Sequence, residues 1–247
     1  MTDPEESPPC VVVLHEVWGS DSNIDAACKR LRKLGFATTV PSLYKGHEAL
    51  LVPRNIQKAM AVIWDFSLEE RCDKKRVAAE AARKGADAQT RDVLSVLYDP
   101  RFRDGMMEIV LDAITEARKR HAKVATLGFS LGGGISLATT TRPGHPDAAI
   151  AYCGEPPNAK LRGTAVPMLA ICASHDELMN PLMPGFIKAA LEQDLDLTVK
   201  TFPGTEHDFF NMNFKERYNA SAAREAWDVT SWFLSKALGW APSHSKR

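Results

Sequence analysis

Short apolar runs alternate along the chain with segments in which apolar residues recur every three to four positions. The runs are rich in β-branched residues, as in strands buried on both faces of a parallel sheet. They occupy residues 10–14, 36–40, 124–129, 148–152, 166–172 and 197–202. The periodic segments are typical of amphipathic helices and occupy residues 24–34, 106–117, 182–191 and 222–238. This alternation predicts an α/β protein with a doubly wound, mostly parallel sheet and helices on both faces.

One segment, at about residues 48–104, interrupts this alternation. Its pattern is mostly helical without a clear strand, and it carries the charged clusters Glu69-Glu70-Arg71, Lys74-Lys75-Arg76 and Arg83-Lys84. We interpret it as a charged helical insertion in a single domain that spans residues 1–247. It is expected to lie over the sheet edge and to form part of a lid. The simpler alternative is that the charges mark the solvated face of ordinary helices.

Composition narrows the range of partners and compartments. Lys plus Arg and Asp plus Glu both number 31, so no overall basic field attracts nucleic acid or an anionic membrane. No apolar run is long enough for a signal peptide or a membrane span. The five cysteines are scattered and never spaced as C-x-x-C, which disfavours a disulfide framework and a zinc ribbon. We expect a cytoplasmic monomer or small homo-oligomer that binds neither nucleic acid nor membrane.

The segment Gly128-Phe129-Ser130-Leu131-Gly132 lies between a predicted strand and a predicted helix. G-x-S-x-G is a short pattern, but a nucleophile elbow requires this strand–turn–helix setting. The sharp turn strains the backbone at Ser130, and closely packed glycines tolerate it while the hydroxyl stands clear of the sheet. The Leu131 amide would then face a developing oxyanion. The alternative role for Ser130 is that of a helix N-cap.

A serine nucleophile needs a base near it and a carboxylate that orients the base. In the α/β-hydrolase fold the acid and then the histidine follow the serine along the chain. Asp176 follows an apolar run, with Glu177 beside it as a competitor, and His207 follows the last predicted strand. The order predicts an α/β-hydrolase fold with the triad Ser130, Asp176 and His207, and no cofactor.

The remaining histidines have weaker settings. Four lie in polar or terminal segments, where we expect surface or supporting roles: His47, His121, His145 and His244. A metal cluster is conceivable at the predicted site edge from five residues: His15, Glu16, His175, Asp176 and His207. No local ligand pair such as H-E-x-x-H anchors such a cluster, so we expect no metal.

These residues belong to a longer pattern, from about Val11 to Leu238, that resembles the dienelactone hydrolases, also called carboxymethylenebutenolidases. The matching segments are Leu14-His15-Glu16-Val17-Trp18-Gly19, Val40-Pro41-Ser42-Leu43-Tyr44, Gly128 to Gly133, Asp176, and Gly204 to Phe209. The resemblance implies that Glu16 lies beside the nucleophile and that Val17 supplies the second oxyanion amide. It also implies that Asp176 and His207 complete the triad.

The chain departs from the family pattern at two positions. The family usually carries cysteine at the elbow, where the glutamate helps to keep the thiol neutral until substrate binds. Because a serine hydroxyl is not stored as an anion near pH 7, Glu16 would lose that role and His207 would act as an ordinary general base. The family also holds a substrate carboxylate with an arginine four residues after the histidine, where this chain has Asn211. Four arginines in the insertion are candidates to replace it: Arg71, Arg76, Arg83 and Arg91.

The sequence therefore predicts hydrolysis of a small ester or lactone through an acyl-enzyme on Ser130. Two alternatives stay open. One is a ligand-binding scaffold of the same fold without turnover. The other is a Cys-to-Ser variant of a thiol hydrolase, with Ser130 either natural or introduced.

Overall fold

The computed structural model describes residues 7–157 and 165–240. Its centre is a sheet of six strands in the order β2-β1-β3-β4-β5-β6, and every neighbouring pair is parallel. The strands are β1 (Cys10–Leu14), β2 (Ala37–Thr39), β3 (Val124–Phe129), β4 (Ala148–Tyr152), β5 (Met168–Ala173) and β6 (Leu197–Phe202). The predicted parallel sheet is confirmed, with the second and fifth strands shifted by one to two residues at their ends.

The six strands differ in burial. Every residue of β1, β3, β4 and β5 is buried, as the apolar runs predicted. Residues of β2 are half-buried, and in β6 only the last residue is buried. The expectation that all six runs are buried on both faces is wrong for these two, because each is an edge strand with a neighbour on one side only.

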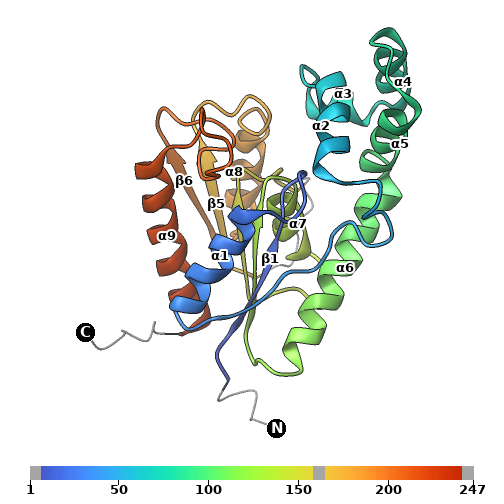
Figure 1. The fold of residues 1–247 in the computed structure, drawn as a ribbon. Helices are drawn as coiled ribbons and strands as arrows, with labels where there is room; N and C mark the ends of the chain where they lie inside the picture. The colour runs from blue at the N-terminus through green and yellow to red at the C-terminus, as the bar shows by residue number, and fades with distance from the viewer. Residues whose placement is uncertain (1–6, 158–164, 241–247) are drawn as a thin grey trace.

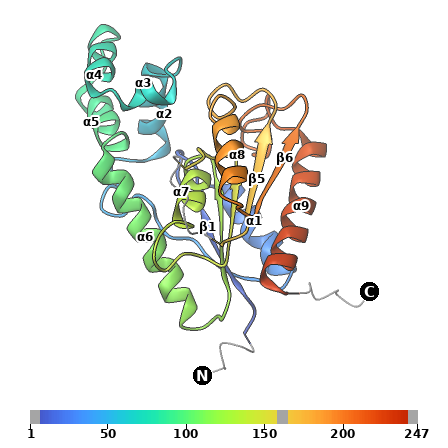
Figure 2. The ribbon, with the colours of Figure 1, turned by 180° about the vertical axis from the view of Figure 1, so that it is seen from behind.

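Helices cover both faces of the sheet. On one face lie α1 (Ser22–Lys33) and α9 (Ala220–Leu238), and on the other lie α6 (Pro100–Arg118), α7 (Leu131–Thr139) and α8 (Met183–Glu192) (Figures 1 and 2). The alternation of side chains along β1 separates the two cores. Val11 and Val13 pack on the side of α1, whereas Val12 and Leu14 pack on the side of α6. The predicted doubly wound architecture is confirmed.

Four helices lie between β2 and α6 and form the insertion. They are α2 (Pro53–Val62), α3 (Leu68–Cys72), α4 (Lys74–Arg83) and α5 (Ala88–Leu97), and they stand beside the carboxyl end of the sheet in Figure 1. Their apolar side chains, such as Ile56 and Leu94, belong to the same core cluster as Leu14. Most of their charged side chains face solvent, where Arg83 pairs with Glu80 at 2.6 Å, whereas Arg71 of α3 is buried. The insertion is thus packed on the core and solvated on its outer side.

The end of the insertion lies earlier than residue 104. Asp99 accepts a hydrogen bond from the Arg101 amide at 2.9 Å, and Pro100 occupies the first turn, so α6 begins at Pro100. Residues 100–104 are therefore the start of a helix that packs on one face of the sheet.

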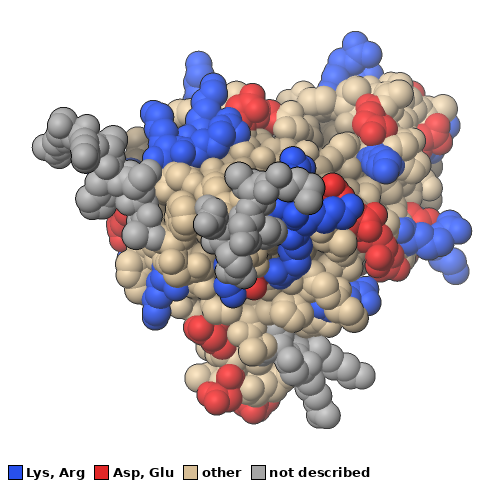
Figure 3. All heavy atoms as spheres, turned by 90° about the horizontal axis from the view of Figure 1, so that it is seen from below, with Lys and Arg blue, Asp and Glu red and all other residues tan. Residues whose placement is uncertain are grey.

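The surface of the described residues carries both signs of charge. Lys, Arg, Asp and Glu all appear on the face seen from below in Figure 3, which is the end of the molecule opposite the carboxyl ends of the strands. Within residues 7–157 and 165–240, no helix has the length and apolar character needed to cross a membrane.

Candidate active site

Ser130 occupies the sharp turn between β3 and α7. Its φ of 48° is positive, a conformation that is rare for residues other than glycine. The turn is closed by glycines that leave room for the crossing backbone. A Cβ on Gly128 would lie 2.0 Å from the Gly132 carbonyl oxygen, and a Cβ on Gly132 would lie 2.6 Å from that of Leu14. The chain therefore forms the elbow only with glycine at both positions.

The Ser130 hydroxyl is hydrogen-bonded to a histidine that is in turn hydrogen-bonded to an aspartate. Ser130 Oγ lies 2.8 Å from His207 Nε2, and His207 Nδ1 lies 2.8 Å from Asp176 Oδ2. Ser130 is the N-cap residue of α7 by position, but its side chain makes no cap bond to the helix. Glu177, the competing acid, is exposed. The geometry fits an imidazole that donates from Nδ1 to Asp176 and accepts the serine proton at Nε2.

The carboxylate of Asp176 is held by the backbone that follows it. Its side chain is 1% exposed, and Oδ1 accepts hydrogen bonds from the amides of Leu178 and Met179 at 3.2 and 3.1 Å. These two bonds leave Oδ2 for His207. A loop at the end of β5 thus fixes the acid in place before any substrate arrives.

The basicity of His207 results from opposing effects. Burial by itself lowers the pKa of the imidazole, but the hydrogen bond and charge of Asp176 oppose this, with smaller contributions from Asp208 and Glu16. The net result is a pKa above the ordinary value for histidine. His207 is therefore suited to accept a proton from Ser130 near neutral pH.

Glu16 lies just after β1 and is almost completely buried. Its Oε1 accepts hydrogen bonds from Asn211 Nδ2 at 2.8 Å and from Asn23 Nδ2 at 3.3 Å, while Oε2 has no partner among the described residues. The resemblance places Glu16 beside the nucleophile, yet none of these bonds reaches Ser130. Asn211, at the position of the family's arginine, is fully buried and holds Glu16. This contact between Asn211 and Glu16 was not predicted from the sequence.

The pKa of Glu16 predicts an unusual pH dependence of stability. Burial, then the charges of Asp208 and Asp21, raise this pKa from 4.5 to about 8. Between these values the folded chain binds a proton that the unfolded chain has lost, so the free energy of unfolding falls as pH rises, by up to about 1.4 kcal/mol per unit. In Glu16→Gln this component of the slope is expected to vanish.

Urea unfolding at several pH values between 5 and 8 measures this difference, with Glu177→Gln as the control for loss of an exposed carboxylate. The same pH slope in Glu16→Gln as in the unaltered protein would show that Glu16 titrates normally.

Two backbone amides belong to residues that line the cavity beside Ser130. A tight turn, closed by a hydrogen bond of 3.1 Å from the Gly19 amide to the Glu16 carbonyl, brings Val17 into the cavity that Ser130 and Leu131 also line. The Val17 amide donates to no backbone carbonyl within the described chain. The Leu131 amide begins α7 and so has no helical acceptor. Both are thus available to the oxyanion role that the sequence suggested for them.

The cavity beside Ser130 has a volume of about 370 Å³, a size that suits a small-molecule substrate. Its other wall comes from the insertion, through Met60, Leu97 and Tyr98, and from Arg103 of α6. The insertion therefore encloses the site on one side. The helices of the insertion also pack on the core, and the lid role stays a prediction.

Arg71 is the arginine of the insertion that lines this cavity. It is 6% exposed, and its Nε and Nη2 donate to the backbone carbonyls of Phe66 and Trp64, both at 3.0 Å. Among the described residues it takes part in no ion pair that would neutralise it. The other three candidates are engaged elsewhere: Arg76 with Glu70, Arg83 with Glu80, and Arg91 with the carbonyl of Ala86.

The five-residue metal cluster is not formed. His15 is buried, with Nδ1 donating to the Glu16 carbonyl at 2.7 Å and Nε2 accepting from the Leu43 amide at 3.2 Å. His175 is exposed. Of the other histidines, His47 contacts the ring of Phe102 and His121 bonds to the Pro8 carbonyl. His145 bonds to the carbonyl of the adjacent Pro146, and His244 lies outside the described residues.

A smaller group of potential ligands does converge in the described chain. The ligand atoms of Cys153, Asp176 and His207 lie within 4.8 Å of one another. Burial raises the pKa of the Cys153 thiol well above its ordinary value, which keeps it protonated. Because Asp176 and His207 are already bonded to each other, this group is better described as part of the triad than as a metal site.

A nucleophile elbow at the carboxyl edge of a doubly wound parallel sheet is the architecture of the α/β-hydrolases. Within that class, the chain belongs to the dienelactone hydrolase family, whose model matches residues 1–238. The family predicted from the sequence is confirmed, and the protein is accordingly a hydrolase.

Relatives of similar length support this assignment. A protein of Saccharolobus solfataricus, provisionally named carboxymethylenebutenolidase, is 29% identical over 96% of this chain and 92% of its own length. Protein usf of Aquifex pyrophilus is 27% identical over 95% of this chain and 91% of its own length. The crystal structure of a dienelactone hydrolase-like promiscuous phosphotriesterase from metagenomic libraries is 18% identical, with a TM-score of 0.65 over 94% of this chain and 88% of that chain. This last similarity concerns the fold.

Proposed function

We propose that the protein hydrolyses small esters or lactones through an acyl-enzyme formed on Ser130. The observation that supports this most directly is the pair of 2.8 Å hydrogen bonds that joins Ser130, His207 and Asp176 beside a cavity of substrate size. Membership of the dienelactone hydrolase family points to the same chemistry.

The proposed reaction has two halves. His207 accepts the Ser130 proton as Oγ attacks the carbonyl carbon, and the amides of Val17 and Leu131 stabilise the negative oxygen that forms. His207 then gives this proton to the departing alcohol, which leaves an ester on Ser130. Water then attacks that ester while His207 accepts its proton. The bond between Ser130 Oγ and the acyl carbon breaks as His207 gives the proton to Oγ, which releases the acid and restores Ser130. Asp176 keeps the imidazole oriented throughout.

A fluorophosphonate probe and p-nitrophenyl acetate test this proposal together. We expect one probe molecule to be bound covalently to Ser130, located by mass spectrometry of the digested protein, and turnover of p-nitrophenyl acetate to disappear as labelling proceeds. Turnover that persists in fully labelled protein would refute a role for Ser130. Absence of both labelling and turnover would favour a ligand-binding scaffold.

The proposed substrate carries an anionic group that Arg71 binds. A buried charge without an ionic partner is costly, and the hydrogen bonds of the Arg71 guanidinium among the described residues go to neutral groups: the carbonyl oxygens of Phe66 and Trp64 and the side chain of Tyr98. A carboxylate in the cavity would neutralise it with charge-assisted hydrogen bonds. Arg103, a second cation on the cavity wall, is already paired with Glu155 at 2.5 Å.

Replacement of Arg71 by methionine is expected to raise the KM for an ester with a terminal carboxylate about 10- to 100-fold, the loss of one charged hydrogen-bonded contact. A neutral ester of equal length should change by less than about threefold. Steady-state kinetics with mono-p-nitrophenyl succinate and p-nitrophenyl pentanoate measure the two. Arg76→Met is the matched control, because Arg76 pairs with Glu70 and lines none of the three cavities that Arg71 borders. Equal losses for both esters in Arg71→Met would mean that Arg71 is structural.

A further inference from the structure

Arg217 lies in the loop between β6 and α9 and joins three features of the site. Its Nη1 lies 2.8 Å from Asp208 Oδ2, and its Nε lies 3.3 Å from Glu206 Oε2. These two acids flank His207 on either side in the sequence. The same guanidinium lies 5.3 Å from the ring centre of Trp64, which belongs to the insertion. One cation thus contacts both the loop of the catalytic base and the insertion beside it.

Asp208 is the more consequential of the two acids. Its side chain is 6% exposed, and Arg217 is the only ion-pair partner recorded for it in the described chain. The Glu206 side chain is 56% exposed and largely screened by water. The negative charge of Asp208 raises the pKa of His207. Because Arg217 pairs with Asp208, its positive charge offsets part of this increase.

The groups that face His207 come from several elements. Ser130 lies at the elbow, Asp176 follows β5, Glu16 follows β1 and Asp208 is the next residue in the chain, while the Cys153 thiol lies near the imidazole at the end of β4. Three of these are acids, and each raises the pKa of His207. Arg217 is the cation that contacts one of them directly.

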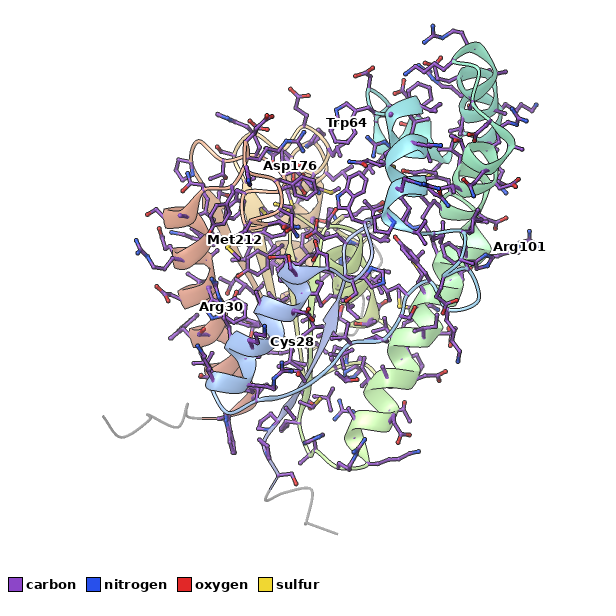
Figure 4. The ribbon with its side chains drawn as sticks, in the orientation of Figure 1. Cys28, Arg30, Trp64, Arg101, Asp176 and Met212 are labelled. Carbon is purple, nitrogen blue, oxygen red and sulfur yellow. The ribbon has the colours of Figure 1, made fainter. Side chains whose placement is uncertain are left out.

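Trp64 lies just beyond the end of α2. Figure 4 shows it on the side of the insertion that faces the loops where Asp176 lies. Its side chain lines the open groove that also contains Trp18, Phe214 and Arg217. Its backbone carbonyl accepts a hydrogen bond from Arg71 Nη2 at 3.0 Å. The contact with Arg217 therefore lies next to the segment that presents Arg71 to the cavity.

We propose that Arg217 is a positioning residue that couples the loop of the catalytic base His207 to the helical insertion covering Ser130. It neutralises Asp208 on one side and holds Trp64 on the other. The proposal rests on the proposed function in that His207 is taken to be the base. It goes beyond that function because it assigns a role to a residue that need not touch the substrate.

Loss of Arg217 has two expected consequences. The charge of Asp208 is no longer offset, so protonated His207 is favoured and the free base that Ser130 needs is less abundant at low pH. In Arg217→Ala, kcat/KM is expected to fall about three- to tenfold at pH 6 and less at pH 9, where the imidazole is neutral in either protein. Trp64 also loses its cation, so amide exchange in residues 60–72 is expected to accelerate at least about threefold.

Two measurements that need no turnover test these consequences. Imidazole NMR of His207 across pH is expected to show an upward shift in Arg217→Ala, a return toward the original value in Arg217→Ala with Asp208→Asn, and little change in Arg217→Lys. Hydrogen exchange of residues 60–72 is expected to rise in Arg217→Ala and in Trp64→Leu, whereas Trp64→Leu leaves the His207 titration unchanged. Lys200→Ala is the matched control, because Lys200 pairs with Glu225 at 2.7 Å and lies 5.2 Å from the ring centre of Phe202.

The proposal is supported only if both readouts move in Arg217→Ala and neither moves in Lys200→Ala. An unchanged His207 titration, or unchanged exchange in residues 60–72, would overturn it. Neither readout depends on hydrolysis. Failure of the protein to react with fluorophosphonate would therefore contradict the proposed function, while the coupling through Arg217 could still be measured.

Discussion

Replacement of Ser130 by alanine is expected to lower kcat/KM for p-nitrophenyl acetate by at least about a thousandfold. Alanine has no atom that can form the acyl-enzyme, and the only side-chain hydrogen bond of Ser130 in the described structure is the one to His207. The fold should survive, because Ser130 provides no cap for α7 and the strained backbone at φ 48° is no harder for alanine than for serine. Residual activity would come from the oxyanion amides and His207 acting on water.

The measurement is initial-rate hydrolysis at pH 8, with circular dichroism to confirm that the variant is folded. Turnover within about tenfold of the unaltered protein would contradict the acyl-enzyme mechanism and favour direct attack by water.

Replacement of Ser130 by cysteine addresses whether the site evolved for a thiol. If it did, lactonase activity in Ser130→Cys should rise. A decrease would identify serine as the native nucleophile. The setting of Glu16 favours the second outcome, because its hydrogen bonds go to Asn211 and Asn23.

Replacement of Asp176 by asparagine is expected to reduce kcat by a factor on the order of a thousand to ten thousand. The amide oxygen of asparagine can still accept from the backbone of Leu178 and Met179, so the loop should keep its shape. The amide nitrogen would then face His207 Nδ1 as a donor and favour the tautomer that carries its proton on Nε2. That tautomer is unable to accept the proton of Ser130.

The rate of p-nitrophenyl acetate hydrolysis and the NMR titration of His207 measure this effect. The pKa of His207 should fall in Asp176→Asn, because Asp176 supplies the strongest of the effects that raise it. Glu177→Gln is the matched control on the adjacent exposed residue. Equal losses in the two variants would mean that the 2.8 Å bond between Asp176 and His207 is not needed for catalysis.

The order of strands and helices could largely be predicted from the local hydrophobic pattern of the sequence. Continuous apolar runs predicted the six strands, apolar residues at helical spacing predicted the helices that cover the sheet, and the glycines about Ser130 marked the elbow. Two features differed from the prediction, because each depends on neighbouring groups that the hydrophobic pattern does not take into account. The helix α6 begins at Pro100 because Asp99 caps it, and β2 and β6 are half-exposed because of their position at the sheet edges.

The site was readable only in part. The order of Ser130, Asp176 and His207 along the chain indicated which residues meet, since the carboxyl ends of parallel strands share one edge. The order of residues along the chain does not determine the direction in which each side chain points beyond the end of its strand. It therefore left Asp176 and Glu177 as competitors and listed His15 beside Glu16 as a possible metal ligand, whereas His15 is turned toward Leu43.

By itself, the sequence determined the family, the α/β-hydrolase fold and the residues of the candidate triad, because these depend on spacing and on short-range backbone geometry. Only the tertiary structure decided which of the four candidate arginines in the insertion reaches the cavity, that Asn211 holds Glu16, and that Arg217 bridges Asp208 and Trp64. These contacts join residues separated by 9 to 195 positions. The charge and hydrogen bonding of a buried group are set by whichever distant side chains pack against it, and no local pattern encodes that packing.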